Sequence, residues 1–345
     1  MRNRGRFVVV VILASIAFTS FIFYFYNAFT SPNVLIHDGD QNTYIYIPEG
    51  TDFHGVLKNL EKGRVVQDGL TFAFVSKVMG YQDNVKPGRY LLTPRMTNRE
   101  LVRLLRSGKR DEVPVTFSVA RKVNELPSVL CKDILAREDE FSLLLKDSAF
   151  LAGYGFDTNN VMAMFVPNTY KVYWDSDAKG LFARMNNEYK KFWNAERTAK
   201  ASELRMSPIE VTTLASIVQS ETIKADERPK VAGLYLNRLD RGILLQADPT
   251  VVFAVGDFSL ARVLNKHLQV DSPYNTYMYK GLPPGPVAMA EVNSIDAVLN
   301  SEKHDYIFMC SKGDVTGYHN FAKSNRQHNT NRTIYANNLR KRGLR

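Results

Sequence analysis

Residues 207–222 read SPIEVTTLASIVQSET, a stretch that predicts the central helix of a folded domain. Ser207 and Glu210 form a capping box, in which each side chain satisfies a free N–H group at the helix start. Pro208 takes the first helical position, where its missing N–H costs nothing. The apolar residues that follow recur with helical spacing along one face. They are Val211, Leu214, Ala215 and Val218.

Glu221 closes this stretch on the flank of the apolar face, at ~100° per residue. A carboxylate against apolar surface has a raised pKa, because burial disfavours its charged form. A general acid that protonates a glycosidic oxygen near neutral pH needs such a pKa. The alternative is an exposed Glu221 at a helix end, paired with Lys224 or Arg228. Periodicity alone leaves both open.

The N-terminus predicts a membrane anchor. Residues 7–26 carry no charge, and about 20 apolar residues span a hydrocarbon core ~30 Å thick. Three arginines lie in the tail 1–6, and no Lys or Arg follows the apolar run before Lys58. This asymmetry predicts a cytoplasmic tail, with all later residues outside the cytoplasmic (inner) membrane, in the periplasm.

The alternative for this N-terminus is a cleaved signal peptide. Small residues should then precede the cleavage site, but residues 21–26 are FIFYFY. We therefore expect an uncleaved, single-pass anchor. Export argues against nucleic acid and cytosolic cofactors as partners. The net charge of +10 suits an anionic membrane and wall.

Cysteine and histidine patterns give no metal motif. The chain has two cysteines, Cys131 and Cys310, and neither C-x-x-C nor H-E-x-x-H. We therefore expect no metal and no cofactor. An exported protein can form a disulfide, so both a bridge and two separate thiols stay open.

The 345 residues are enough for two folded units. Residues 27–43 are polar and predict a tether. Residues 44–110 predict a small α+β module with the order strand, helix, helix, strand, helix. Its signals are a strand at 44–47, Thr51 as a helix cap, a helix over 70–79, a strand at 89–92 and a capping box from Thr97 to Glu100.

Residues 111–345 predict a larger α+β domain. A strand covers 112–120, and helical patterns over 123–200 are interrupted at 167–170. A helix from Pro229 ends at Gly242, and Arg238 interrupts its apolar stripe, either to reach solvent or to pair with a buried carboxylate. The segments 305–310 and 317–321 predict a hairpin that presents His319.

Polar side chains between these elements are candidates for binding. Asp248 precedes Pro249 and is either a helix cap or a second catalytic carboxylate. Residues 272–286 form a loop rich in Pro and Gly, a kind of segment that often carries function. Tyr rings there suit sugar stacking and Asn275 has both a donor and an acceptor, although the same residues could fill the core.

Six segments together resemble the MltG/YceG-like endolytic murein transglycosylases. They are 214–222 (LASIVQSET), 237–239 (NRL), 245–250 (LQADPT), 272–277 (SPYNTY), 281–286 (GLPPGP) and the His319 to Asn329 ending. The resemblance covers nearly the whole chain, and it implies an N-terminal anchor, a LysM-like module at 44–110 and a catalytic domain at 111–345. The family's catalytic glutamate falls on Glu221. Many members have Glu where this chain has Gln219, and Asp where it has Asn168.

The implied reaction uses one carboxylate. Glu221 would protonate the oxygen between MurNAc and GlcNAc, and the C6 hydroxyl of the same MurNAc would close onto C1, leaving a 1,6-anhydro end. Loop positions and family motifs give the candidate substrate-binding residues. They are Gln246, Asp248, Tyr274, Asn275, Tyr277 and His319. The resemblance also implies internal cuts in nascent peptidoglycan strands, beside a peptidoglycan synthase.

Two other functions stay open. A muramidase-type hydrolase would pair Glu221 with Asp248, since hydrolysis of this kind needs two carboxylates. A wall-binding scaffold of the synthesis machinery would bind through the 44–110 module and would not need Glu221 for chemistry.

Overall fold

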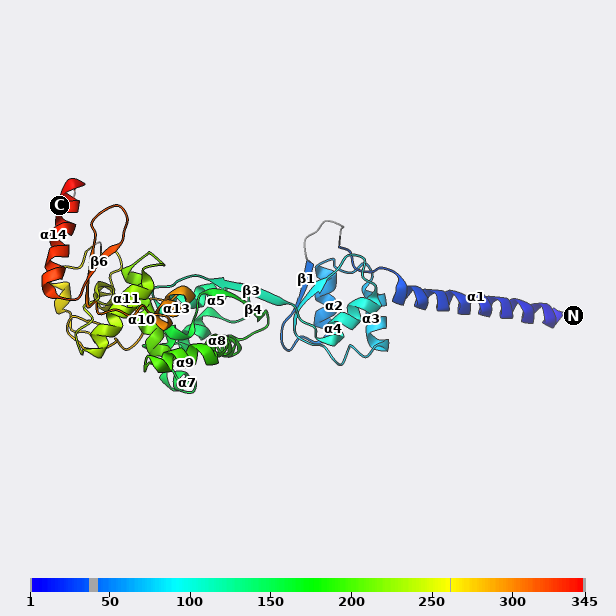
Figure 1. Ribbon diagram of the computed structural model, residues 1–345. Helices are drawn as coiled ribbons and strands as arrows, with labels where there is room; N and C mark the ends of the chain where they lie inside the picture. Colours follow the sequence, from blue (N-terminus) through cyan, green and yellow to red (C-terminus); the bar gives the residue numbers. More distant parts are fainter. Residues whose placement is uncertain (1, 37–42, 261, 344–345) are drawn as a thin grey trace. The chain divides into compact units, whose positions relative to one another are not determined.

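The computed structural model describes residues 2–36, 43–260 and 262–343 (Figure 1). The chain forms two compact units. Unit 1 comprises 1–114 with the short segments 133–135 and 171–176, and unit 2 comprises the remaining residues to 345. The mixture of helices and small sheets agrees with the predicted α+β class.

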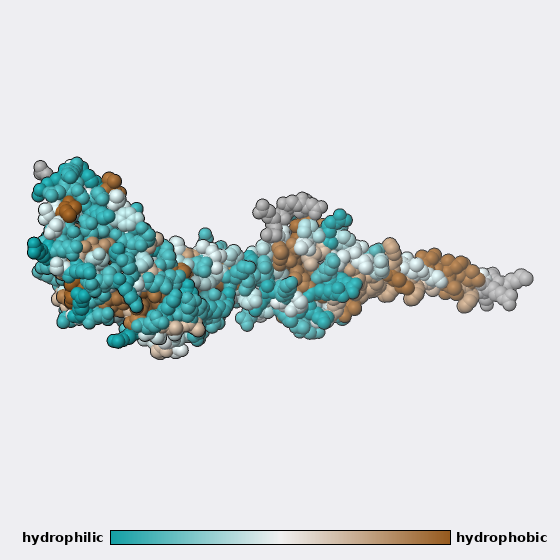
Figure 2. Space-filling model, in the orientation of Figure 1, coloured by the Kyte–Doolittle hydropathy of each residue, from teal (hydrophilic) through white to brown (hydrophobic). Residues whose placement is uncertain are grey.

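Unit 1 begins with the helix α1 (Arg2–Thr30). Its residues Gly5–Thr30 are long and apolar enough to cross a membrane. Large apolar side chains such as Phe7, Ile16 and Phe23 are exposed along it, and Figure 2 shows this hydrophobic surface in brown. The finding is consistent with a single-pass membrane anchor.

The rest of unit 1 has the predicted order of elements. They are β1 (Thr43–Ile47), α2 (Phe53–Lys62), α3 (Gly69–Val78), β2 (Gly88–Leu92) and α4 (Asn98–Ser107). The two strands pair antiparallel, with Ile45 opposite Tyr90. The capping box of Thr97 and Glu100 at α4 is confirmed. Thr51 does not cap α2, because the Asp52 carboxylate accepts the Gly55 N–H one residue later.

The first part of the predicted tether over 27–43 packs into unit 1 in the structure. The helix α1 continues to Thr30, and the Asn33 and Val34 N–H groups donate to the Met96 carbonyl. Ala28, Val34 and Ile36 are buried in the core of unit 1. Apolar residues within a polar stretch therefore attach this segment to the unit. Residues 37–42 of the predicted tether lie outside the described residues.

Unit 2 is mainly helical. The strand predicted at 112–120 is shorter, as β3 (Glu112–Phe117), and its partner β4 (Asn168–Tyr173) begins within the interruption predicted at 167–170. Each of these two strands contains residues of both units. The helices are α5 (Leu126–Leu130), α6 (Glu138–Leu144), α7 (Ser148–Ala152), α8 (Ala178–Phe192), α9 (Ala195–Glu203), α10 (Pro208–Glu221), α11 (Arg228–Asp240), α12 (Asp248–Val255), α13 (Val292–Leu299) and α14 (Asn325–Lys341). The predicted hairpin is present, as β5 (Phe308–Ser311) and β6 (His319–Ala322).

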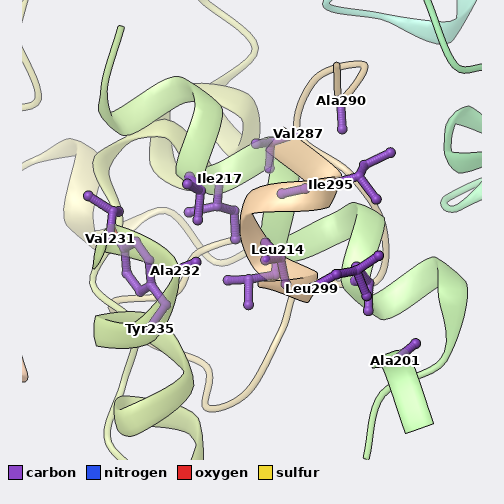
Figure 3. Packing of buried hydrophobic residues seen from close by; sticks show 14 of the residues in the cluster. Ala201, Leu214, Ile217, Val231, Ala232, Tyr235, Val287, Ala290, Ile295 and Leu299 are labelled. Atoms are coloured by element: carbon purple, nitrogen blue, oxygen red, sulfur yellow. The ribbon is translucent and has the colours of Figure 1, made fainter. Parts of the chain in front are cut away.

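The core of unit 2 is built around α10 (Figure 3). Leu214 and Ile217 of α10 pack with Val231 of α11 and Ile295 of α13, and all four are completely buried. α11 also approaches the chain closely at Gly233, where a Cβ would lie 2.2 Å from the Glu302 carbonyl oxygen. This packing fixes the C-terminal end of α10, which carries Glu221.

Candidate active site

Glu221 is the last residue of α10, because the backbone of Thr222 is extended. Its Oε1 accepts a hydrogen bond of 2.9 Å from the Tyr235 hydroxyl. Burial raises the pKa of Glu221 to about 7. The negative charge of Asp248 adds to this increase, while Tyr235 and His319 oppose it. The carboxyl group therefore exchanges its proton near neutral pH, as its place beside the apolar face predicted.

The alternative ion pairs of Glu221 are not formed. Arg228 binds Glu291 at 3.0 Å, and the Lys224 ammonium lies 5.2 Å from the centre of the Tyr318 ring. Because both cations have other partners, neither lowers the pKa of Glu221 through a direct contact.

Glu221 and Asp248 line two cavities. The first has a volume of about 490 Å³ and an apolar wall that includes Phe258, with the guanidinium groups of Arg121 and Arg262. The second has a volume of about 330 Å³ and a more polar lining. It includes Gln246, Tyr277 and His319. An extended ligand that filled both cavities would therefore pass Glu221.

Asp248 is the first residue of α12, and its side chain makes no capping bond. The prediction of a cap is therefore wrong. Its Oδ1 instead accepts a hydrogen bond of 2.6 Å from the Tyr277 hydroxyl, and the side chain is exposed to solvent. The structure thus places Asp248 and Tyr277 together at the second cavity, as two of the predicted binding residues.

His319 begins β6 and is held by a buried carboxylate that sequence analysis missed. Its ring Nδ1 lies 2.7 Å from Oε2 of Glu227, and its backbone N–H donates a hydrogen bond of 2.9 Å to Oε1 of Glu227. Burial alone would raise the pKa of Glu227, but hydrogen bonds from His319 and Thr222 outweigh it and lower the pKa. A deprotonated Glu227 can only accept, so Nδ1 carries the proton. In the neutral form of His319, which lines the second cavity, Nε2 is then an acceptor.

Gln246 is positioned by Arg238. The Nη2 group of Arg238 donates to Oε1 of Gln246 at 2.6 Å, and its other nitrogens donate to the Leu244 and Ile307 carbonyls. Arg238 is buried, so it neither reaches solvent nor pairs with a carboxylate, and both predicted alternatives are wrong. Carbonyl and amide oxygens satisfy its donors instead, which ties residues 244–246 to the segment before β5.

Two predicted binding residues lie away from both cavities. Asn275 is completely buried, and its Nδ2 donates to the Leu268 and Val270 carbonyls. The Tyr274 ring packs against Phe253, with 4.6 Å between the ring centres. That these side chains contact substrate stays a prediction. Asn275 attaches the 272–277 loop to the preceding segment, because irregular backbone leaves carbonyls that need internal donors.

The two departures from the family pattern also have structural places. Gln219 donates to the Met289 carbonyl and accepts from the Glu291 N–H and the Ser294 hydroxyl. The Gln219 amide thus uses both a donor and an acceptor to attach residues 289–294 to α10. Asn168 is exposed at the start of β4. Neither residue lines the two cavities.

Tyr235 is a further residue that sequence analysis missed. It lies on the apolar face of α11, where a tyrosine needs a partner for its hydroxyl, and that partner is Glu221.

Cys131 and Cys310 are free thiols. Among the residues that the structure describes, no group of three or more His, Cys, Asp or Glu side chains is placed to hold a metal ion.

Comparison with known proteins supports a relationship over most of the chain. It is 28% identical to an endolytic murein transglycosylase of Streptococcus pneumoniae strain D39, over 91% of this chain and 62% of that protein. It is 26% identical to an endolytic murein transglycosylase of Bacillus subtilis strain 168, over 86% of each. The chain thus spans about three fifths of the pneumococcal relative's length.

A solved structure and a family description agree with this relationship. The crystal structure of a YceG-like protein from Listeria monocytogenes matches 85% of this chain and 99% of its own, with a TM-score of 0.53 and 25% identity. Residues 45–333 match the description of the YceG-like family. The segment contains Glu221, both cavities and most of unit 1, so the chain belongs to the YceG-like family.

Proposed function

We propose that this protein is a membrane-anchored, endolytic lytic transglycosylase that cleaves the MurNAc–GlcNAc bond of peptidoglycan strands. The observation that carries the proposal is a single carboxylic acid, Glu221. Its pKa is about 7, and its side chain lines both cavities. The names of the streptococcal and bacillar relatives support the substrate and the reaction.

In the proposed reaction, Glu221 gives its proton to the oxygen that leaves C1 of MurNAc. The glycosidic bond breaks as the C6 oxygen bonds to C1, and the carboxylate takes the C6 hydroxyl proton. Glu221 thus ends protonated and no water is consumed. Because Tyr235 occupies Oε1, Oε2 is the oxygen that would exchange these protons. The internal nucleophile has the advantage of an intramolecular reaction.

The glycan strand would occupy both cavities, with the scissile bond at Glu221. In the second cavity, Gln246, Asp248, Tyr277 and His319 supply the acceptors and donors that orient sugar hydroxyls. In the first cavity, the ring of Phe258 offers an apolar face. The guanidinium groups of Arg121 and Arg262 suit the carboxylates of peptide stems.

The same proposal assigns the rest of the chain. Residues 1–6 form a cytoplasmic tail and 7–26 span the cytoplasmic (inner) membrane, which leaves the catalytic domain at 111–345 in the periplasm. Basic residues before the span and none shortly after it support this orientation. The order β1, α2, α3, β2 supports a LysM-like module at 44–110. A peptidoglycan synthase that supplies nascent strands would be a partner.

A muramidase-type hydrolase is the second candidate. Asp248 supports it, because this carboxylate lines both cavities with Glu221 and raises the pKa of Glu221. Asp248 accepts a hydrogen bond from Tyr277 at this place, and a hydrolase of this type needs a second carboxylate. The two reactions differ in their products, since hydrolysis leaves a reducing end.

The test is a digest of purified peptidoglycan by the full chain in detergent, with products identified by mass spectrometry. We expect anhydro-MurNAc ends from the wild type and a loss of at least about 10³-fold in Glu221→Gln, because the acid is removed. Glu210→Gln is the matched control. It lies at the other end of α10, where glutamine also completes a capping box.

Three outcomes would contradict parts of the proposal. Reducing ends in place of anhydro ends would support the hydrolase, with Asp248→Asn then expected to abolish cleavage. Equal products from wild type and Glu221→Gln would remove Glu221 from the chemistry. Binding of peptidoglycan without any cleavage would favour the wall-binding scaffold.

A further inference from the structure

The helix α3 is apolar on both of its faces although it lies at the surface of unit 1. Its inner face is completely buried through Phe72 and Val75. On its outer face, Leu70 is 80% exposed and Val78 is 60% exposed, with Phe74 between them at helical spacing. An apolar face of a helix normally packs against an apolar neighbour. Water is therefore a poor neighbour for this outer face.

The two other helices around the same core do not share this pattern. α2 exposes Lys58 and α4 exposes Arg103, as expected for helices that pack one face and solvate the other. The anomaly is thus confined to α3. It cannot be explained by a general lack of charged residues in unit 1.

The position of α3 relative to α1 supplies the neighbour. The Phe74 ring lies 4.4 Å from the ring of Phe25 and 6.3 Å from that of Phe29, between ring centres. Figure 1 shows α3 beside the C-terminal end of α1. About 20 residues cross ~30 Å of hydrocarbon. Counted from Phe7, that length ends at Tyr26. Phe25 and Phe29 lie on either side of this boundary, and Phe74 is beside them.

A hydrogen bond also fixes α1 to the unit at this level. Nδ2 of Asn98, the first residue of α4, donates to the Ala28 carbonyl at 2.9 Å, and both residues are buried. α3 packs against α4 in turn. The outer face of α3 is therefore held at the depth where α1 leaves the hydrocarbon.

Cations gather at the C-terminal end of α3. Lys77 is exposed on the helix itself, and the Arg106 guanidinium donates to the carbonyl of Met79, the residue that follows Val78. Lys86 and Arg103 line the same hollow as Arg106, and none of the described residues that line it is acidic. Apolar side chains beside such cations are typical of helices that lie in an anionic membrane interface.

We infer that α3 is a second membrane contact, whose outer face of Leu70, Phe74 and Val78 lies in the interface of the bilayer that α1 spans. Arg103, Arg106 and Lys86 lie where anionic phospholipid headgroups would meet them. The inference rests on the proposed anchor but not on glycan cleavage. It means that the module rests on the membrane surface and does not swing freely from α1.

The test places a tryptophan on each surface of the full chain. The protein is reconstituted into vesicles of phosphatidylcholine and phosphatidylglycerol, with and without brominated phosphatidylcholine as a quencher. We expect Leu70→Trp and Val78→Trp to add fluorescence that the brominated lipid quenches by at least about half. Leu91→Trp, at an exposed position of β2, should add fluorescence that is quenched no more than that of the native tryptophans.

Ile16→Trp, in the middle of α1, separates this inference from the anchor. Quenching at position 16 without quenching at positions 70 and 78 would overturn the contact of α3 and leave the anchor intact. No quenching at position 16 would overturn both, whereas cleavage in detergent would be unaffected. The tryptophan at position 70 could instead escape the brominated lipid and become less accessible to a water-soluble quencher as the protein-to-lipid ratio rises. That result would identify a second copy as the neighbour and overturn the inference.

Discussion

A buried amide network of unit 1 and the carboxyl group of Glu221 in unit 2 use their polar atoms in opposite ways. In unit 1, Nδ2 of Asn33 donates to Oδ1 of Asn98 at 2.6 Å and to the Asp68 carbonyl at 2.9 Å, and Asn98 binds the Ala28 carbonyl. These amide groups form their hydrogen bonds with other groups of the same unit. In unit 2, Glu221 accepts from Tyr235 through one oxygen and lines two cavities.

The difference indicates where chemistry takes place. A fully satisfied buried network fixes a structure, since any change leaves a costly unpaired group. A partly satisfied group beside a cavity has a perturbed pKa and can still reach a ligand, which is typical of an active site. Unit 1 thus fits the role of a support, and unit 2 the role of a catalyst. Substitutions in each unit can break this assignment.

Apart from Glu221 itself, the largest expected effect is at Glu227. Glu227→Gln replaces one acceptor oxygen by a donor, so His319 would change tautomer and offer Nε2–H to the second cavity in place of a lone pair. We expect a loss of about 10–100-fold in kcat/KM, the scale of partners that orient a functional histidine. Cleavage kinetics measure the loss, and ¹⁵N shifts of the His319 ring report the tautomer.

The matched control is Asp226→Asn at the neighbouring position. Asp226 accepts from the Tyr318 hydroxyl at 2.9 Å and is exposed, so we expect activity within about twofold of wild type, as for most surface substitutions. If Glu227→Gln keeps full activity with an altered tautomer, His319 does not orient the substrate. If both variants lose activity equally, the effect is a general one of the 222–228 segment.

A smaller effect, of a different kind, is expected in unit 1. Asn98→Ala leaves one N–H of the Asn33 amide and the Ala28 carbonyl without their partner, which costs about 1–3 kcal/mol of stability. Thermal unfolding would show a lower Tm for this unit, while cleavage per folded molecule stays at the wild-type rate. Asn59→Ala, at an exposed position of α2, should change neither. Loss of cleavage by folded Asn98→Ala would end the division into support and catalyst.

Local signals explain what the sequence predicted well. The capping box and apolar spacing of residues 207–218 were sufficient to predict α10, and they placed Glu221 at its flank with a raised pKa. The order of elements in unit 1 followed from similar signals of turns, caps and periodicity. In these cases the interacting groups lie within a few residues of one another.

Contacts between distant residues explain what the sequence did not predict. Glu227 and His319 are 92 positions apart, so no spacing rule connects them. Asn275 has the chemistry of a sugar ligand, but the Leu268 and Val270 carbonyls occupy its amide. Arg238 meets carbonyl oxygens, where the predicted alternatives were solvent or a carboxylate. Tertiary packing decides each of these outcomes.

The smallest expected effect is a shift of the pH profile. In the proposed reaction Glu221 acts first as an acid, so kcat/KM should fall as the pH rises through its pKa of about 7. The Tyr235 hydroxyl stabilises the carboxylate and lowers this pKa, whereas the charge of Asp248 raises it. Tyr235→Phe should therefore move the basic limb to higher pH, and Asp248→Asn should move it to lower pH, each by less than about one unit.

The opposite signs make this pair its own control. A general disturbance of the cavity would move both limbs in the same direction or lower the plateau without moving either limb. Initial rates of cleavage measured from pH 5 to 9 distinguish these cases, with Glu210→Gln expected to follow the wild-type profile. If the limb near pH 7 stays in place in both variants, the group that titrates there is not Glu221. The partly satisfied carboxylate beside two cavities would then no longer distinguish unit 2 from unit 1.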